Sequence, residues 1–375
     1  MSLLKRLERA AKFGLALIAV PLLWRPRRRR PATALRNVRR ILLVRIDDRL
    51  GEALLMTPLF SVLKRAMPGS QLDALVHAKT SRAISGHPKV DRVIAFDARR
   101  LFLGALAPGI RALRQAAYDA VIDCTNWTDP SVRSALVCRL IGSRSVVIGP
   151  DARPVAGLYS IAVAPREGAQ SELEQRVHLL SPLARSLGTA RLSFRRPNPA
   201  PTLKPLLDRL RSTPFAVVNP GGRLDWRRIP PSAFAAAAHV LMESGFSILI
   251  TWGPGEASLA KSVAQLAPQS VLAPPTDIDD LAALMNAAAL TICNNTGPMH
   301  LSVALGTPTL AFFLKMDPKR WGYAYPPHRM IDLTATVDSS ELDCTVRLEV
   351  SKFVEDLRRW RARGGERSQA KDSGP

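Results

Sequence analysis

The chain has 375 residues, about two and a half times an ordinary domain of roughly 150 residues, so two domains are expected. Hydrophobic residues make up 47% and charged residues 22%, which excludes a wholly disordered chain, and no apolar run approaches the roughly 20 residues that span a bilayer. Half of the net charge of +22 lies in the first 40 residues, so affinity for polyanions is predicted for that segment.

Residues 1–40 form the first predicted segment, a basic amphipathic arm. Apolar side chains at helical spacing share one face of residues 3–20. A short apolar stretch then runs directly into the arginine block 25–30, whereas a signal peptide would end in a small-residue cleavage site. We therefore predict that residues 1–35 bind an anionic membrane surface. The alternatives are an arm that binds nucleic acid and a solvated tail.

From residue 41 the chain alternates between strand-like and helix-like segments. Residues 41–46 are nearly all apolar, as expected of a buried parallel strand. Residues 52–66 place apolar side chains at helical spacing, and Pro68-Gly69 ends that helix. Residues 150–172 are predicted to be a loop. Further strands are predicted at 72–77, 92–96, 118–123 and 145–149.

A second alternating series begins at residue 215, after the proline-rich stretch 196–201. Two such series predict an α/β protein with two doubly wound domains, at 41–200 and 201–345, which face a central cleft where a ligand binds. A C-terminal helix at 346–363 and a disordered tail at 364–375 complete the chain. The strands of the second series are predicted near 215–218, 247–251, 270–272, 289–293 and 308–313, and its helices near 232–244, 256–267, 279–288 and 298–305.

The first stretch with candidate chemistry follows the first strand and reads Asp47-Asp-Arg-Leu-Gly-Glu52. It places three carboxylates at the carboxyl end of a strand, where a general base can reach the cleft. Spacing alone leaves a second interpretation equally open, in which Asp47 or Asp48 caps a helix.

The second stretch, 219–228, follows the first strand of the second series. Gly221 and Gly222 expose backbone N–H groups, and Arg223, Arg227 and Arg228 add positive charge. Such a combination suits a diphosphate. A basic surface loop is the alternative, and no G-K-[ST] sequence follows that would make this a Walker loop.

The third stretch, Trp252-Gly-Pro-Gly-Glu256, is another strand-to-helix turn. Its glycines let a ligand approach the backbone, and Glu256 could accept hydrogen bonds from ribose hydroxyls. By itself this signal is weak, because glutamate is common near the first turn of a helix.

The fourth stretch, Asn294-Asn-Thr-Gly-Pro-Met-His300, lies where a strand ends and a helix begins near Pro298. Free N–H groups and the helix dipole make such a turn an anion site. His300 could donate to a phosphate or could be a core histidine, and the residues alone leave both readings open.

We predict no metal and no cofactor. Asp277-Ile-Asp279 matches a D-x-D motif by letter but precedes a predicted helix, so capping is the favoured interpretation. The four cysteines are scattered, with no C-x-x-C pair, which indicates a reducing compartment and argues against a cysteine-rich zinc site.

Together the four stretches resemble glycosyltransferase family 9, the ADP-heptose:lipopolysaccharide heptosyltransferases, over residues 41–345. The most specific part is 295–308, NTGPMHLSVALGTP, which is similar to the family's D-[ST]-G-x-x-H-x-x-A-A-L-G-x-P. The opening strand, turn and helix at 41–58 and the acceptor-domain segment from Asp123 to 133–136 also resemble the family. Three positions depart from its pattern: Glu52 stands for aspartate, Arg227 for lysine and Asn295 for aspartate.

The resemblance implies a GT-B fold of two Rossmann-like domains and an inverting, metal-independent glycosyl transfer. Glu52 would be the general base, and Arg227 and His300 would stabilise the leaving diphosphate. The resemblance places the donor against Gly221, Gly222, Arg227, Glu256, Asn295, Thr296, Gly297, Pro298, Met299 and His300, and the acceptor near Asp48, Asp123 and Arg133.

The partners implied are a nucleotide-sugar donor, a lipid-linked glycan acceptor of the lipopolysaccharide type and the anionic membrane, with no nucleic acid. The chain would lie in the cytoplasm of a bacterium, peripheral to the inner face of the plasma (inner) membrane. One alternative is a sugar-nucleotide epimerase of the same GT-B shape, which would leave the arm unexplained. Another is a catalytically inactive sugar-nucleotide-binding protein at the membrane. A nucleic-acid-binding protein is disfavoured because the positive charge is concentrated in one arm and the sequence shows no pattern typical of a recognition helix.

Overall fold

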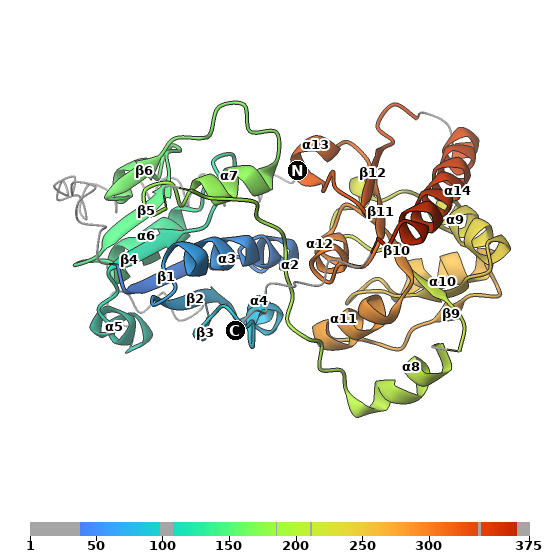
Figure 1. The fold of residues 1–375 in the computed structure, drawn as a ribbon, viewed down its shortest axis with the longest axis horizontal. Helices are drawn as coiled ribbons and strands as arrows, with labels where there is room; N and C mark the ends of the chain where they lie inside the picture. The colour runs from blue at the N-terminus through green and yellow to red at the C-terminus, as the bar shows by residue number, and fades with distance from the viewer. Residues whose placement is uncertain (1–37, 98–107, 185, 211, 337–338, 366–375) are drawn as a thin grey trace.

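The computed structural model describes residues 38–97, 108–184, 186–210, 212–336 and 339–365. This part of the chain forms two α/β domains, each built on a six-stranded parallel sheet, and they lie side by side (Figure 1). The predicted fold class, two doubly wound domains of the GT-B type, is confirmed.

The N-terminal sheet has the strand order β3-β2-β1-β4-β5-β6. Every residue of β1 except the first is buried, which explains its nearly continuous apolar sequence. The order reverses between β1 and β4, so the loops after these two strands flank the crevice where ligands bind in such sheets. The strands are β1 (Arg40–Arg45), β2 (Gln71–His77), β3 (Arg92–Phe96), β4 (Ala120–Asp123), β5 (Val146–Pro150) and β6 (Ile161–Val163). The helices are α2 (Leu50–Leu54), α3 (Thr57–Ala66), α4 (Ala78–Ile84), α5 (Pro108–Gln115), α6 (Val132–Ile141) and α7 (Glu172–His178).

The C-terminal sheet has the order β12-β11-β10-β7-β8-β9 and reverses between β7 and β10. The loops after these two strands carry the second and fourth candidate stretches. The strands are β7 (Phe215–Asn219), β8 (Ser247–Ile250), β9 (Val271–Leu272), β10 (Leu290–Asn294), β11 (Thr309–Phe313) and β12 (Arg329–Asp332). The helices are α8 (Lys204–Leu210), α9 (Pro231–Glu243), α10 (Ala257–Leu266), α11 (Ile278–Ala287), α12 (Gly297–Ala304), α13 (Pro318–Trp321) and α14 (Ser339–Ala362).

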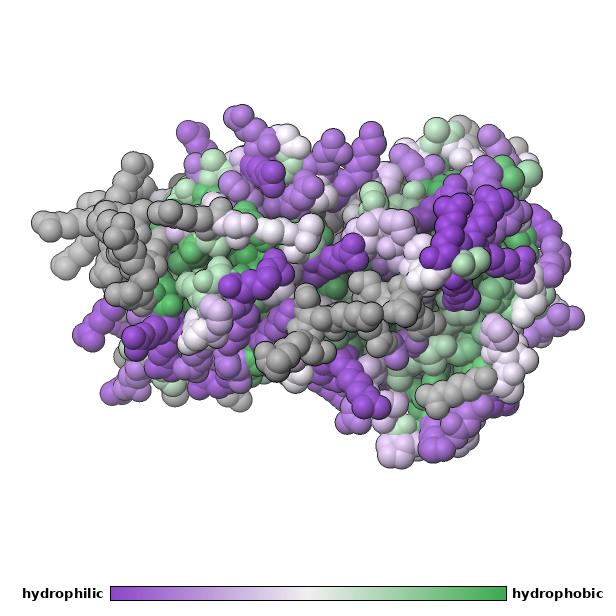
Figure 2. Space-filling view, viewed as in Figure 1, coloured by the Kyte–Doolittle hydropathy of each residue, from purple (hydrophilic) through white to green (hydrophobic). Residues whose placement is uncertain are grey.

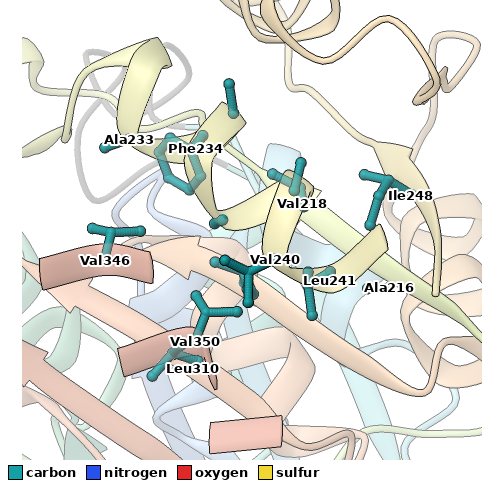
Figure 3. Close-up of a cluster of buried hydrophobic side chains, with 14 of the residues drawn as sticks. Ala216, Val218, Ala233, Phe234, Val240, Leu241, Ile248, Leu310, Val346 and Val350 are labelled. Carbon is teal, nitrogen blue, oxygen red and sulfur yellow. The ribbon is translucent and has the colours of Figure 1, made fainter. Parts of the chain in front are cut away.

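Helix α14 is part of the C-terminal domain. Its residues Val346 and Val350 are fully buried and meet Val240 of α9 and Leu310 of β11 in one apolar core (Figure 3). The helix begins at Ser339, earlier than the predicted 346. Leu342 is also buried, so the apolar stripe extends one turn further towards the N-terminus than the sequence-based boundary allowed.

Three local predictions are corrected. The segment 150–172, predicted to be a loop, contains β6, and the sequence analysis also missed β12. Both are short edge strands, too brief to show a clear pattern. The single helix predicted over 52–66 is two helices, α2 and α3. Pro58 lies in the first turn of α3 and has no N–H to continue a helix, and the Thr57 hydroxyl donates to Leu54 O (2.8 Å).

Residues 1–37 of the predicted arm and most of the predicted C-terminal tail lie outside the described residues. The last residues assigned to the arm belong to the N-terminal domain, since Val38 is buried in its core and Arg40 begins β1. Among the residues that are described, no helix combines the length and apolar character needed to cross a bilayer. Hydrophilic side chains cover much of the face shown in Figure 2. Trp226, 46% exposed, is one of only three large hydrophobic side chains exposed in the described part.

Candidate active site

The two domains meet where α2 packs against α12. A β carbon on Gly51 would lie only 2.5 Å from Cδ2 of His300, and one on Gly297 would lie 3.2 Å from Leu50. These two glycines therefore allow the first and fourth candidate stretches to touch. The turn after β7 reaches the same place, since a β carbon on Gly222 would lie 2.8 Å from Thr296. The predicted catalytic and donor-binding loops therefore lie together.

Glu52, the predicted base, is buried at this junction and 6% exposed. Its Oε2 accepts from Nη2 of Arg176 at 2.6 Å and lies 2.7 Å from Nη2 of Arg45. Burial by itself would raise the pKa of this carboxyl, but the charges of Arg176, Arg45 and Arg49 outweigh it and hold the pKa well below the usual range. Glu52 is therefore ionised at neutral pH.

The two arginines that hold Glu52 belong to a larger buried network. Both guanidinium groups also donate to Cys124 O, from Arg45 at 2.6 Å and from Arg176 at 3.1 Å. Arg176 donates further to Glu172, at 2.8 Å. In this way Glu52 of α2, Arg45 of β1 and Arg176 of α7 are held in one arrangement. Arg45, Arg176 and Glu172 were not predicted, although Arg45 in the otherwise apolar segment 41–46 was a visible signal.

A second link in this network crosses between the domains. Arg320 of α13, in the C-terminal domain, donates to the Thr128 hydroxyl at 3.1 Å and approaches Glu172 Oε2 at 3.5 Å. The residues around Glu52 therefore contact the C-terminal domain as well as the N-terminal domain, to which Glu52 belongs.

The glycine turn at 219–222 is held from two sides. Asn294, fully buried at the end of β10, donates to Pro220 O at 2.8 Å and accepts from Ile229 N at 3.1 Å. Glu256 accepts from Gly222 N at 2.7 Å and from Gly253 N at 2.9 Å. A β carbon on Gly221 would fall 2.0 Å from the Glu256 carboxylate, so a larger residue there would displace this carboxylate from the loop. Both Glu256 oxygens hold loop backbone, and a contact with ribose stays a prediction.

Arg227, the predicted diphosphate ligand, lies with its guanidinium 4.6 Å from the centre of the Trp226 ring. Burial, and then the positive charges of Arg223 and Arg49, lower its pKa. Its Nε is buried without a hydrogen-bond partner, and no carboxylate lies within 4.0 Å of Arg227 or Arg223 in the described part of the chain. Arg223 and Arg227 therefore carry charges that no carboxylate of the described residues neutralises, as expected of an anion site, whereas Arg49 lies 3.6–3.8 Å from three carboxylates.

The α12 turn supplies fewer backbone donors than predicted. Pro298 has no N–H, and the Met299 N–H already donates to Thr296 O at 3.1 Å. The remaining candidates are the N–H groups of Thr296 and Gly297, at the helix N-terminus. Asn295, which stands where the family has aspartate, is nearly buried, and its N–H donates to Phe312 O at 3.1 Å.

His300 is buried in the same turn, and its Nδ1 lies 2.5 Å from the Tyr323 hydroxyl. Burial lowers the pKa of His300 to about 4, so the ring is neutral at pH 7 and can offer a phosphate an N–H but not a charge. Tyr323 was not predicted, because its position in the loop after α13 carries no sequence signal.

The three predicted acceptor-side residues differ in accessibility. Asp48 is exposed and lies 3.9 Å from Lys79, and Arg133 is exposed on α6. Asp123 is fully buried, and its carboxylate accepts from Tyr159 at 2.8 Å and from Ser134 at 2.9 Å. In this conformation Asp123 can shape the loop after β4 but cannot touch an acceptor.

Capping of α11 by Asp277 is confirmed, since its carboxylate accepts from Asp279 N at 2.9 Å and from Asp280 N at 3.0 Å.

Comparison with known proteins places this arrangement in a family. Residues 109–350, more than half of the chain, match glycosyltransferase family 9 (heptosyltransferase). Lipopolysaccharide heptosyltransferase 1 of Pseudomonas aeruginosa is 26% identical over 297 residues, which are 74% of this chain and 79% of that protein. Lipopolysaccharide heptosyltransferase 3 of Escherichia coli is 24% identical over 288 residues, which are 72% of this chain and 82% of that protein.

Solved structures show the same fold. The E. coli heptosyltransferase WaaC with ADP superimposes with a TM-score of 0.65 at 23% identity, covering 85% of this chain and 99% of that one. A family 9 glycosyltransferase from Veillonella parvula gives a TM-score of 0.69 at 18% identity, with coverage of 85% and 97%. A UDP-N-acetylglucosamine 2-epimerase from Listeria monocytogenes, at 12% identity, gives 0.52 and shares the fold only. With the family match over most of both domains, the chain belongs to glycosyltransferase family 9 and is a glycosyltransferase.

Proposed function

We propose that the protein transfers a heptose from ADP-heptose to a lipopolysaccharide-type acceptor, with inversion at the anomeric carbon and without a metal ion. The observation that carries this proposal is the pair Arg223 and Arg227, which have no carboxylate within 4.0 Å among the described residues. They follow Gly222, whose β carbon would lie 2.8 Å from Thr296 at the start of α12. Guanidinium groups can neutralise a diphosphate in the way that a metal ion does in other enzymes. The related lipopolysaccharide heptosyltransferases support the choice of sugar and acceptor.

In the proposed reaction an acceptor hydroxyl oxygen attacks the anomeric carbon while the bond to the diphosphate oxygen breaks. The electron pair of that bond leaves on the diphosphate, where Arg227, the free N–H groups at the start of α12 and neutral His300 stabilise it. Trp226 holds the Arg227 guanidinium by stacking, and Asn294 and Glu256 hold the glycine turn that carries it. The donor therefore lies on the C-terminal domain.

Glu52 takes the proton of the attacking hydroxyl. The low pKa of Glu52 keeps it ionised and makes it a weak base, so it accepts the proton when bond formation has already made the hydroxyl acidic. Oε2 is held by two arginines, and Oε1 is the oxygen left for the proton. The acceptor lies on the N-terminal domain, on the side of Asp48 and Arg133.

Sugar nucleotides screened by thermal shift test the donor proposal, because a ligand that binds only the folded state raises the unfolding temperature by mass action. ADP-heptose and ADP are expected to stabilise the protein more than UDP- or GDP-linked sugars. Preference for a UDP-sugar, together with its conversion to an epimer in the absence of acceptor, would replace heptosyl transfer with the epimerase alternative.

Arg227→Ala should weaken ADP binding and slow transfer. A charge-assisted contact with a diphosphate contributes about 1.5–3 kcal/mol, equivalent to a loss of roughly ten- to a hundredfold in affinity. Isothermal titration with ADP measures the loss. Arg223→Ala is the comparison, and its effect should be smaller because Arg223 is exposed at the turn. Small and equal losses in both variants would show that the loop is a generic basic surface.

We also propose that the enzyme lies on the cytoplasmic face of the inner membrane, bound through residues 1–35. Deleting this arm should abolish sedimentation with anionic vesicles and leave transfer to a soluble acceptor largely intact, since β1 begins at Arg40. Each basic residue near an anionic surface contributes on the order of 1 kcal/mol. If the truncated protein still sediments with the vesicles in moderate salt, the anchor lies elsewhere. Salt-sensitive binding of the arm to duplex DNA would favour the nucleic-acid alternative.

A further inference from the structure

Arg49 lies between three carboxylates without bonding closely to any of them. Its guanidinium nitrogens lie 3.6 Å from Asp47, 3.8 Å from Glu52 and 3.6 Å from Asp129. Within the described residues its side chain donates no hydrogen bond, whereas Arg45 and Arg176 beside it have partners at 2.6–2.8 Å. A guanidinium has five donors, so Arg49 is held by charge alone and its donors remain available.

Arg49 stands directly before Leu50 and Gly51, which meet the start of α12 in the C-terminal domain. A β carbon on Gly297 would lie 3.2 Å from Leu50, and one on Gly51 would lie 2.5 Å from His300. Arg49 therefore lies at the domain junction, and its charge adds to the lowering of the pKa of Arg227. An anion bound between these two like charges would relieve their repulsion. Arg49 is also one-third exposed and sits in the turn before α2, where its side chain can change direction without disturbing the core.

We propose that Arg49 is a positioning residue that moves from the carboxylates to the diphosphate of the donor when the donor binds. This inference rests on the proposed function. It gives the N-terminal domain a contact with the donor, so that the anion joins Arg49 and Arg227 and draws the two domains together.

The exchange would also prepare the base. Oε1 of Glu52, the oxygen left for the proton, is the one that Arg49 approaches, at 3.8 Å. When Arg49 turns to the diphosphate, Oε1 becomes open to the acceptor hydroxyl while Arg45 and Arg176 keep Oε2 in place. Donor binding would thereby precede productive binding of the acceptor.

Isothermal titration of the full-length protein with ADP tests the inference. Arg49→Met should raise the dissociation constant about tenfold or more, and Arg49→Lys should recover part of the loss because the charge returns without the fork. Lys204→Met, which removes an exposed charge from α8, is the matched control and should bind ADP as the wild type does.

Asp129→Asn distinguishes exchange from simple attraction. Asp129 is exposed and holds Arg49 at 3.6 Å, so this variant should fold normally and release Arg49. In the wild-type background this change should raise ADP affinity by up to about fivefold, which corresponds to the loss of one exposed ion pair. In the Arg49→Met background the rise should be smaller. Arg49→Met with unchanged ADP affinity, or an Asp129→Asn effect that is equal in both backgrounds, would overturn the inference alone. A wild-type protein that binds no nucleoside diphosphate would overturn the proposed function together with it.

Discussion

Glu52→Gln is expected to lower the rate of sugar transfer by about 10²–10⁴-fold, the usual contribution of a general base. Glutamine keeps the size and polarity of the side chain but cannot accept the proton of the acceptor hydroxyl. ADP affinity should not fall, because Glu52 neutralises none of the charge of the donor. Steady-state transfer at saturating donor, together with titration of ADP, separates the two effects.

Three variants serve as controls for this prediction. Glu52→Asp restores the family residue, whose side chain is shorter by one methylene group. This variant should retain partial activity, because its carboxylate lies farther from the acceptor hydroxyl. Asp47→Asn and Asp48→Asn remove the two competing carboxylates of the same turn and should retain most of the activity. If Glu52→Gln transfers sugar at nearly the wild-type rate while one of the aspartate variants is inactive, the base has been assigned to the wrong carboxylate.

Arg176→Met is expected to lower the free energy of unfolding by about 3–5 kcal/mol, because it leaves buried charges without their partner. Glu172 and Glu52 are 3% and 6% exposed, so water cannot replace the lost guanidinium. Urea unfolding at pH 7 measures the loss. Arg359→Met, which removes an exposed arginine from α14, should cost less than about 1 kcal/mol. Equal losses in both variants would show that the buried network contributes little to stability.

The same variant should change the dependence of stability on pH. The folded-state pKa of Glu52 is depressed, so its ion pairs stabilise the fold above the ordinary pKa of 4.5 and lose that effect as the pH falls below it. Without Arg176 the depression is smaller. The difference in unfolding free energy between wild type and Arg176→Met should therefore be largest near pH 7 and should shrink below pH 4.5. A difference that grows in acid would contradict the assignment of Glu52 and Arg176 as an ion pair.

The sequence predicted the turns of the site better than their surroundings. Glu52, Arg227 and His300 follow strand ends that hydrophobic patterning locates, and strand ends in parallel sheets mark the ligand crevice. Arg176, by contrast, meets Glu52 only because α7 packs near α3, and no local pattern records a contact between residues so far apart in the chain. For Asp123 the motif predicts a place beside the acceptor, and the fold buries the carboxylate, so this role stays a prediction.

The edges of the fold were the least predictable part for a related reason. The patterns of β6 and β12 are too short to distinguish from loops, and pairing with longer neighbours is what makes them strands. The start of α14 was missed because Leu342 adds a single apolar residue ahead of the clear stripe that begins at Val346.

We propose above all that this chain transfers a sugar from a nucleoside-diphosphate donor to a glycan acceptor with inversion. The most direct measurement combines ADP-heptose, a lipopolysaccharide-type acceptor and the full-length enzyme in the presence of a chelator, and follows ADP release and the anomeric configuration of the product by NMR. We expect acceptor-dependent ADP release in step with a product of inverted configuration. Retention of configuration, release only when metal is restored, or release without a glycosylated product would contradict it.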